Sequence, residues 1–299
     1  MKNRLFSRIP EYAKLLRINS WPKNFFVFVA AVFAKRFFEG GYFTILLEGF
    51  ITFSIASSAV YILNDLADAS KDAIHPEKKN RPIASGSISK ASAVVTGLLL
   101  LGFVLFMTFQ LHWPFMKFVW IYIFINILYS TYLKNIVIVD IFCIASGFML
   151  RVIAGAYLIS VDVSNWLILT TIFLSLFLAV MKRRVEIAST TNAKDQRSVL
   201  NDYSLSFTDQ IGAITGSSVI FSYALYSVSD RTVKVFGSDN LVYTTLFVIF
   251  GIFRYMYIVY KKNKGENVIE VVYTDFPSLL NLFLYGVMVI YIIYFHKFM

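Results

Sequence analysis

Long apolar runs, separated by short polar segments, occupy most of the 299-residue chain. A helix needs about 20 apolar residues to cross the hydrocarbon core of a bilayer. Measured against that length, the pattern predicts nine membrane-spanning helices, of which the first is short. The expected spans are 24–38, 42–64, 91–110, 114–133, 136–159, 164–182, 209–229, 239–260 and 276–296. Because no internal repeat or linker divides these runs, we expect a single all-α, polytopic membrane domain over residues 1–299.

Composition favours the same class of protein. Hydrophobic residues make up 58% of the chain, charged residues only 15%, and the mean hydropathy is +0.65. A soluble domain keeps about a quarter of its residues charged, so this chain has too few charges to cover a surface that faces water. The single Cys143 excludes an internal disulfide, and the three scattered His residues argue against a structural zinc site.

Lys and Arg residues are unevenly distributed between alternate connections, and membrane proteins keep such residues on the cytoplasmic side. With the N-terminus inside, 21 of the 28 Lys and Arg residues are cytoplasmic. We therefore expect a multi-pass plasma-membrane protein with a cytoplasmic N-terminus and an external C-terminus. This topology accounts for most of the net charge of +10, so nucleic-acid binding is not needed to explain it. Nothing in the sequence specifies an oligomeric state.

Three cytoplasmic segments are candidates for a function. Residues 1–23 carry basic residues but no apolar core of a signal peptide, and the spacing of Ile9, Tyr12 and Leu16 predicts an amphipathic helix in the headgroup layer. The connections 65–90 and 183–208 are long and polar, whereas the external connections are short. Because loops often carry function, we expect the active site in these two connections, facing the cytoplasm.

The connection after the second span begins with carboxylates. If the helix continues, Asp65, Asp68 and Asp72 lie at positions i, i+3 and i+7 and share one face, with Asn64 at its edge. Like charges this close repel each other unless a cation lies among them, and Mg²⁺ binds through one or two carboxylates together with substrate phosphates. A basic run that includes Arg81 follows, and such residues donate to phosphate oxygens. The alternative, a solvated acidic helix end, is disfavoured because the chain has only 18 acidic residues.

The motif NDxxDxxxD resembles the first aspartate motif of the UbiA-type intramembrane prenyltransferase superfamily, at the cytoplasmic end of the second of nine helices. Further segments extend the similarity, in particular to the decaprenyl-phosphate phosphoribosyltransferases. These segments read RINSWPKNFFVF, NDLADASKDAIHPEKKNRPIASG, YSTYLKNIVIVDIFCIASGFMLRVIAGA and LSLFLAVMKRRVEI. They are spread over about the first two thirds of the chain.

The resemblance implies transfer of a 5-phosphoribosyl group from phosphoribosyl diphosphate to a polyprenyl phosphate lipid. It implies Mg²⁺ as the cofactor, held by Asp65, Asp68 and Asp72, and diphosphate as the leaving group. In the alternative that the same motif permits, a prenyl group moves from a prenyl diphosphate to an aromatic or quinone-precursor acceptor. A transporter is a third interpretation, in which the acidic cluster would be a gate or an ion site.

The segment after the sixth span departs from other members of the superfamily. Where they carry a second aspartate motif, this chain reads Lys182-Arg183-Arg184-Val185-Glu186. We therefore do not expect a second Mg²⁺ site there. The three basic residues are expected to bind the 5-phosphate of the ribose, although such a cluster is also common as a topology signal at the cytoplasmic end of a span.

Arg151, within the fifth span, is a second informative residue. A cation near the middle of a span costs about 2.5–3.5 kcal/mol on insertion scales, so Arg151 should face the interior of the bundle. We expect it to bind a substrate phosphate or to pair with a deep carboxylate; the alternative is a buried ion pair that fixes helix packing. The remaining residues expected to bind substrate are Lys23, Tyr129, Lys134 and Asp140.

Overall fold

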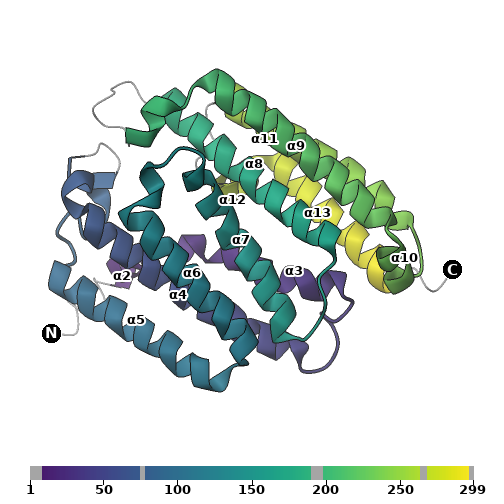
Figure 1. The fold of residues 1–299 in the computed structure, drawn as a ribbon, viewed down its shortest axis with the longest axis horizontal. Coiled ribbons are helices and arrows are strands. Elements are labelled where there is room, and N and C mark those ends of the chain that lie inside the picture. Colours follow the sequence, from purple (N-terminus) through teal and green to yellow (C-terminus); the bar gives the residue numbers. More distant parts are fainter. Residues whose placement is uncertain (1–8, 75–77, 190–197, 263–267, 296–299) are drawn as a thin grey trace.

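The computed structural model describes residues 9–74, 78–189, 198–262 and 268–295 (Figure 1). Within these ranges the chain is helical and forms no β-strand, which confirms the predicted all-α class. Eight helical segments of this part are long and apolar enough to cross a membrane. The long helices are α4 (Tyr42–Asp72), α5 (Lys90–Gln110), α6 (Trp113–Thr131), α7 (Val139–Leu158), α8 (Asn165–Ser189), α9 (Leu205–Val228), α11 (Thr245–Lys262) and α13 (Phe276–Ile290).

Shorter elements cap the bundle at its two ends. The short α-helices are α2 (Ile9–Leu15), α3 (Phe26–Phe33), α10 (Asp230–Phe236) and α12 (Val268–Thr274). The 3₁₀ turns are η1 (Ile18–Phe25), η2 (Lys78–Asn80), η3 (Leu133–Asn135), η5 (Ser198–Asp202) and η6 (Asn240–Thr244), and η7 (Tyr291–Phe295) is a π-helical turn that extends α13.

The first expected span, 24–38, is not among the eight found in the described residues. It folds as the end of η1 followed by α3, and α3 has only 8 residues, about 12 Å of helix. The apolar run is short because Lys35 and Arg36 interrupt it, and Lys35 adopts a positive φ of 60° that ends the helical path. A ninth span and the direction of the N-terminus therefore stay predictions.

Helix α7 occupies the middle of the bundle, where it packs on α3, α6 and α8. The approach of α3 is very close, because a Cβ atom on Gly155 would lie 2.0 Å from the carbonyl oxygen of Val27. Only glycine fits at that position. The close approach holds the short α3 against α7, and it places the polar residues of both elements in the interior.

Hydrophobic side chains form two principal clusters, one on each side of α7. Phe53 and Phe115 belong to the cluster of the first half of the chain, and Phe177 and Tyr255 to that of the second half. In Figure 1 the long helices run in roughly the same diagonal direction, from α5 on one side to α9 and α11 on the other. Helices α5 and α13 are largely exposed along their apolar length, as expected for helices that face lipid.

Two helices are longer than the sequence predicts, and both extend into the expected active-site connections. Helix α4 continues past residue 64 to Asp72, and α8 continues past residue 182 to Ser189. Neither extension contains Gly or Pro, and ion pairs hold both extensions. The predicted loops 65–90 and 183–208 therefore begin with helix, and residues 75–77 and 190–197 lie outside the described part.

Candidate active site

The three aspartates of α4 share one face of a continuous helix, as their spacing predicts. Each of them pairs with a cation from another part of the chain. Asp68 accepts hydrogen bonds from Nζ of Lys134, at 2.8 and 3.1 Å. Asp65 and Asp72 share Arg81, whose Nη1 lies 3.1 Å from Asp65 Oδ1 and 2.7 Å from Asp72 Oδ2. The predicted partners Arg81 and Lys134 are thus brought to the aspartates.

Arg17 also contacts the aspartate face, although it is not among the site residues that the sequence predicts. Its Nη2 lies 2.5 Å from Asp65 Oδ1, and its guanidinium lies 4.6 Å from the centre of the Tyr61 ring. Arg17 belongs to the similar segment RINSWPKNFFVF, but in the sequence it counted only as one cytoplasmic cation among many. Nothing in the spacing of the two residues, 48 positions apart, predicts their contact.

The aspartate face fits a divalent cation between two of its members. Among the described residues, no three His, Cys, Asp or Glu side chains converge as a complete metal site. However, a single guanidinium nitrogen of Arg81 already bridges Asp65 and Asp72, so a positive charge lies where both carboxylates can reach it. Mg²⁺ needs only one or two carboxylates when substrate phosphates complete its shell. Asn64 is half-buried beside this pair, and its side chain has no hydrogen-bond partner in the described ranges.

Arg151 lies deeper in the bundle and is almost fully buried. It donates to Asn24 Oδ1 at 2.6 Å, to the carbonyl oxygen of Gly147 at 2.6 Å, to Ser57 Oγ at 3.1 Å and to the hydroxyl of Tyr122 at 3.2 Å. All of these acceptors are neutral. The deep carboxylate expected as one partner of Arg151 is not found among the described residues.

The absence of a carboxylate beside Arg151 has a structural reason. Asp140, the acidic residue on the same helix, lies in the first turn of α7 and is taken by Arg183. Arg151 is eleven residues further along, about 16 Å of helix. It therefore keeps a positive charge that neutral groups solvate but do not neutralise.

Lys23 adds a second cation close to Arg151. The ammonium group is half-buried and has neither a hydrogen bond nor an ion pair among the described residues. Burial, followed by repulsion from Arg151 and Arg17, lowers the pKa of Lys23 to about 8. Lys23, Arg151 and Arg17 are thus close to one another, and of these three only Arg17 pairs with a carboxylate, Asp65, among the described residues. Such a surplus of positive charge attracts anions.

Arg183 lies in a closed network between α7 and α8. The residue is fully buried, and its guanidinium donates to Asp140 Oδ2 at 2.5 Å, to Glu186 and to the hydroxyl of Tyr129 at 3.1 Å. Tyr203 completes the network by donating to Asp140 Oδ1 at 2.7 Å. Burial and this hydrogen bond raise the pKa of Tyr203. Arg183, Tyr129 and Asp140 are therefore placed to fix the two helices, and the guanidinium does not face an open space.

The run of three basic residues does not form one cluster. Arg184 bonds Asp209 at 2.6 Å and lies 4.0 Å from the centre of the Tyr260 ring. Lys182 is more exposed and lies 3.9 Å from Glu186. Because successive residues of a helix point about 100° apart, the three side chains diverge. The sequence analysis treated this segment as a loop, and the continuation of α8 corrects that interpretation.

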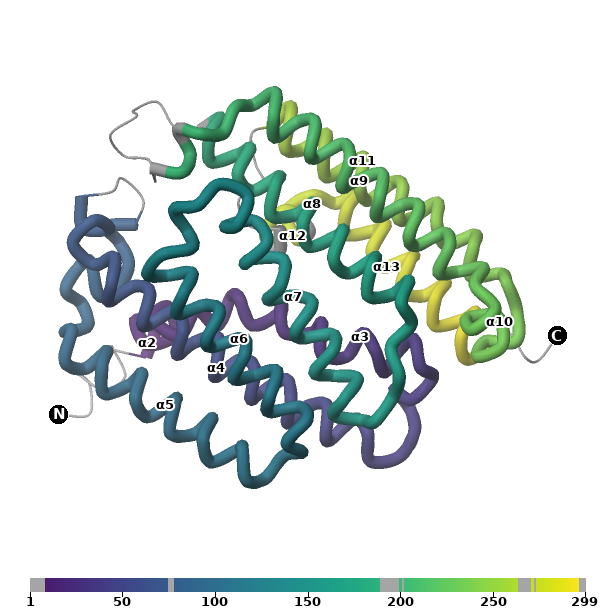
Figure 2. Tube along the Cα trace, viewed as in Figure 1, coloured from purple at the N-terminus to yellow at the C-terminus, as the bar shows by residue number. Residues whose placement is uncertain are grey.

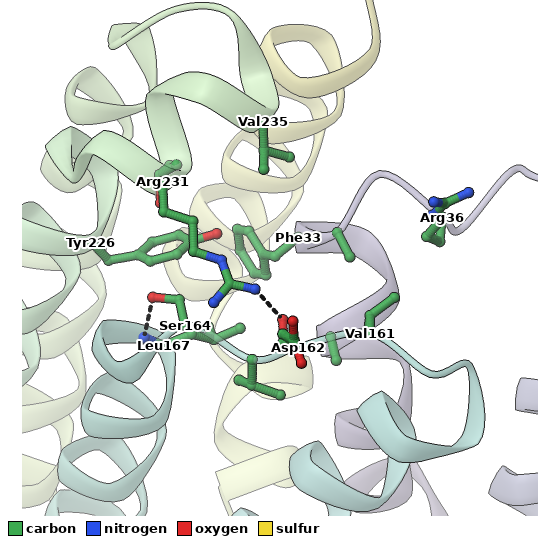
Figure 3. A pocket seen from close by; sticks show the side chains of 13 residues that line it. Phe33, Arg36, Val161, Asp162, Ser164, Leu167, Tyr226, Arg231 and Val235 are labelled. Atoms are coloured by element: carbon green, nitrogen blue, oxygen red, sulfur yellow. Dashed lines mark hydrogen bonds between the residues drawn. The ribbon is translucent and has the colours of Figure 1, made fainter.

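The ends of α4 and α8 and the connection from α6 to α7 lie at the same end of the bundle (Figure 2). The cavity in Figure 3 lies at the opposite end, between the end of α3, the connection from α7 to α8, and α10. It has a volume of about 200 Å³, and Arg231 reaches across it to donate to the carbonyl oxygen of Asp162 at 2.9 Å. None of the predicted site residues lines this cavity.

The sequence of the chain is similar to known proteins. The chain matches the UbiA prenyltransferase family over residues 24–273. The decaprenyl-phosphate phosphoribosyltransferase of Mycolicibacterium smegmatis is 31% identical over 222 residues, which cover 72% of this chain and 70% of that protein. The protein of the same name from Mycobacterium tuberculosis is 31% identical over 227 residues, 72% of each chain.

The fold is shared with solved structures at lower identity. A UbiA homolog from Archaeoglobus fulgidus, solved with GPP and Mg²⁺, has a TM-score of 0.71 and 17% identity, over 95% of this chain and 99% of that one. The same homolog bound to DMAPP and Mg²⁺ has a TM-score of 0.71 and 16% identity. These likenesses show that the helical architecture is common to both proteins.

Proposed function

The chain belongs to the UbiA prenyltransferase family, and on that premise we propose that it transfers 5-phosphoribosyl from phosphoribosyl diphosphate to a polyprenyl phosphate. The family match confirms the resemblance that the aspartate motif indicated. The named relatives, at 31% identity, support the phosphoribosyl donor and the lipid phosphate acceptor. The proposal places the site on the cytoplasmic side of the plasma membrane, as the distribution of Lys and Arg predicts.

The observation that carries this proposal is the surplus of cations around the aspartates. Arg81 and Lys134 pair with acidic residues, whereas Arg151 and Lys23 have no acidic partner among the described residues. A prenyl diphosphate brings one anionic group, and an aromatic acid as acceptor adds one carboxylate. A phosphoribosyl diphosphate with a lipid phosphate brings three, so it uses the additional cations.

In this proposal, Asp65 and Asp72 would hold Mg²⁺, which would supply positive charge beside the departing diphosphate, and Asp68 would position Lys134. Arg81 and Lys134 donate to the diphosphate oxygens, while Lys23 and Arg151 orient the second anion. The bond from the anomeric carbon to the diphosphate oxygen breaks, and diphosphate leaves with the electron pair. An oxygen of the lipid phosphate forms the new bond to that carbon.

No general base is needed, because a phosphate oxygen is already an anionic nucleophile. The main task of the protein is to hold two anions side by side, which the four cations perform by charge and hydrogen bonding. The prenyl tail of the acceptor remains against apolar helix faces.

The test is transfer of label by the purified chain in detergent. Ribose-labelled phosphoribosyl diphosphate, Mg²⁺ and decaprenyl phosphate are mixed, and label is counted in the organic phase. We expect label to move into the lipid and to disappear with EDTA or with Asp72→Asn. Asp162→Asn, the same change at the opposite end of the bundle, serves as the matched control and leaves transfer intact.

A different result identifies the alternative activity. If no label enters the lipid, and a prenyl diphosphate is instead consumed with an aromatic acid as acceptor, phosphoribosyl transfer is wrong for this chain. The aspartate face would then serve a prenyl diphosphate, and the additional cations would need another role.

A further inference from the structure

The cations on the aspartate face come from three different connections. Arg17 follows α2, Arg81 follows η2 and Lys134 lies in η3 between α6 and α7. Their side chains are partly exposed, at 26%, 26% and 13%. Each of the three aspartates is therefore neutralised by a side chain that lies near the water-facing end of the bundle. Arg17 and Arg81 both contact Oδ1 of Asp65, so a metal ion that takes this oxygen displaces both contacts.

Arg17 is presented to Asp65 by a specific turn. Its backbone has φ 49° and ψ 49°, a left-handed conformation that few non-glycine residues adopt. Ser58 on α4 stabilises this turn by two hydrogen bonds. Its hydroxyl donates to the carbonyl oxygen of Leu16 at 2.7 Å and accepts from Trp21 Nε1 at 3.1 Å. The Tyr61 ring lies under the guanidinium. The turn is thus imposed by tertiary contacts, and it fixes where the guanidinium lies.

We infer that Arg17 is a ligand-exchange residue, which holds Asp65 before the donor binds and transfers its hydrogen bonds to the donor diphosphate when the metal takes Asp65. The inference rests on the proposed metal–diphosphate site, and it applies whichever group the diphosphate donor carries. Arg17 acts as a substrate-binding residue in the loaded site and as a competitor of the metal in the free protein.

This double role predicts effects of opposite sign. A metal ion alone gains Asp65 but leaves the Arg17 guanidinium without its carboxylate, so the guanidinium weakens metal binding. When diphosphate accompanies the metal, its oxygens accept the displaced N–H groups, so the same guanidinium strengthens binding. Arg17 therefore makes metal and diphosphate bind cooperatively, and the coupling is the same from either ligand.

The test uses Mn²⁺ and inorganic diphosphate as probes, so that no turnover is required. Free Mn²⁺ is measured by electron paramagnetic resonance during titration of the purified full chain, without and with diphosphate. Arg17→Gly is the chosen variant, because glycine accepts the positive φ and removes the guanidinium without straining the turn. Lys35→Gly is the matched control, since Lys35 is also a cation at positive φ, 60°, near the opposite end of α3.

We expect Arg17→Gly to tighten Mn²⁺ binding in the absence of diphosphate by about tenfold and to weaken diphosphate binding at saturating Mn²⁺ by about tenfold. Lys35→Gly should change neither. Weaker or unchanged Mn²⁺ binding in Arg17→Gly would overturn the exchange role. If the wild-type chain binds Mn²⁺ and Asp65→Asn does not reduce that binding, the metal site itself is wrong, and the proposed function fails with it.

Arg17→Gln provides a second variant. It keeps a hydrogen-bond donor at the position but removes the charge, so it should tighten Mn²⁺ binding in the same direction as Arg17→Gly. If Arg17→Gln binds Mn²⁺ as weakly as the wild type, charge competition is excluded, and the exchange role is overturned.

Discussion

The aspartate face of α4 and the Arg183 network between α7 and α8 both pair arginine with carboxylates at the same end of the bundle. They differ in exposure and in the origin of their cations. Arg17 and Arg81 are 26% exposed and come from connections, whereas Arg183 is 0% exposed and comes from a continuous helix. Arg183 contacts Asp140, Glu186 and Tyr129 at once.

The difference separates a site that can exchange partners from one that cannot. In the pairs of the aspartate face the arginine is partly exposed although the carboxylate is buried, so water reaches the cation and an incoming metal or anion can take its place. A fully buried pair loses several kcal/mol when one partner is removed, because a charge remains in an apolar interior. By this reasoning the aspartate face binds ligands and the Arg183 network fixes the helices that surround it.

The largest effect is expected from Asp72→Asn. The substitution removes one of the two carboxylates that share Arg81, and with it a ligand of the proposed Mg²⁺. Activity should fall about a thousandfold, as for loss of a principal electrostatic group. Label transfer under saturating substrates measures this. Retention of a tenth or more of the wild-type rate would contradict the assignment of Asp72 to the metal.

The second largest effect is expected from Arg183→Met, which tests the Arg183 network. This substitution should lower the stability of the protein. Asp140 and Glu186 would remain without their shared cation, at a cost of about 3–5 kcal/mol. Thermal unfolding in detergent should show a clear fall in Tm. Arg184→Met is the matched control on the adjacent residue, whose partner Asp209 is 38% exposed, and it should cost only about 1 kcal/mol. Equal losses in both variants would remove the distinction between the two clusters.

Arg81→Ala should weaken substrate binding more than it lowers stability. Loss of a charge-assisted hydrogen bond, about 1.5–3 kcal/mol, should raise KM for the donor about 10- to 100-fold. The Tm should fall less than in Arg183→Met, because Arg81 is partly exposed and Arg17 still pairs with Asp65. Lys79→Ala, an exposed cation of the same connection, is the control and should leave KM unaltered. A large fall in Tm with no change in KM would assign Arg81 to structure.

The smallest effect is a pH dependence that comes from Lys23. Its pKa of about 8 lies below the ordinary value for lysine, so the ammonium is charged below pH 8 and loses its proton above it. Because the lipid phosphate binds the charged form, affinity for the polyprenyl phosphate should fall, and its KM should rise, as pH rises through 8, by up to about tenfold per pH unit. KM measured from pH 6.5 to 9.5 tests this. In Lys23→Arg the cation stays charged, so this fall should disappear; an identical profile in both proteins would exclude Lys23.

The sequence predicted those parts of the site that depend on one helix alone. The spacing of Asp65, Asp68 and Asp72 follows directly from helical geometry, and α4 carries all three on one face. Arg17 was missed because its contact depends on a left-handed turn and on the approach of a segment 48 residues away. Periodicity contains no information on either feature.

The residues after the sixth span show the opposite error, because here the sequence predicted a cluster that the structure does not form. Lys182 and its two neighbours are adjacent in the sequence, so they were grouped as one phosphate-binding cluster. Continuation of α8 directs them to different partners, and Arg183 is enclosed by Asp140 on α7. Adjacency in the sequence is a poor guide where a helix extends beyond the apolar run.

The length of α4 determines where the proposed reaction takes place along the membrane normal. Its 31 residues measure about 46 Å, whereas the hydrocarbon layer of a bilayer is about 30 Å thick. A helix of this length reaches beyond the hydrocarbon layer, and in the proposed reaction its acidic end would lie at the level of the lipid headgroups, beside the phosphate of the polyprenyl lipid. The acceptor would then meet the water-soluble donor there while its tail stays in the membrane. A bilayer thinner or thicker by one helical turn, about 5.4 Å, would shift the lipid phosphate relative to Asp65 and slow transfer without any change in the residues of the site.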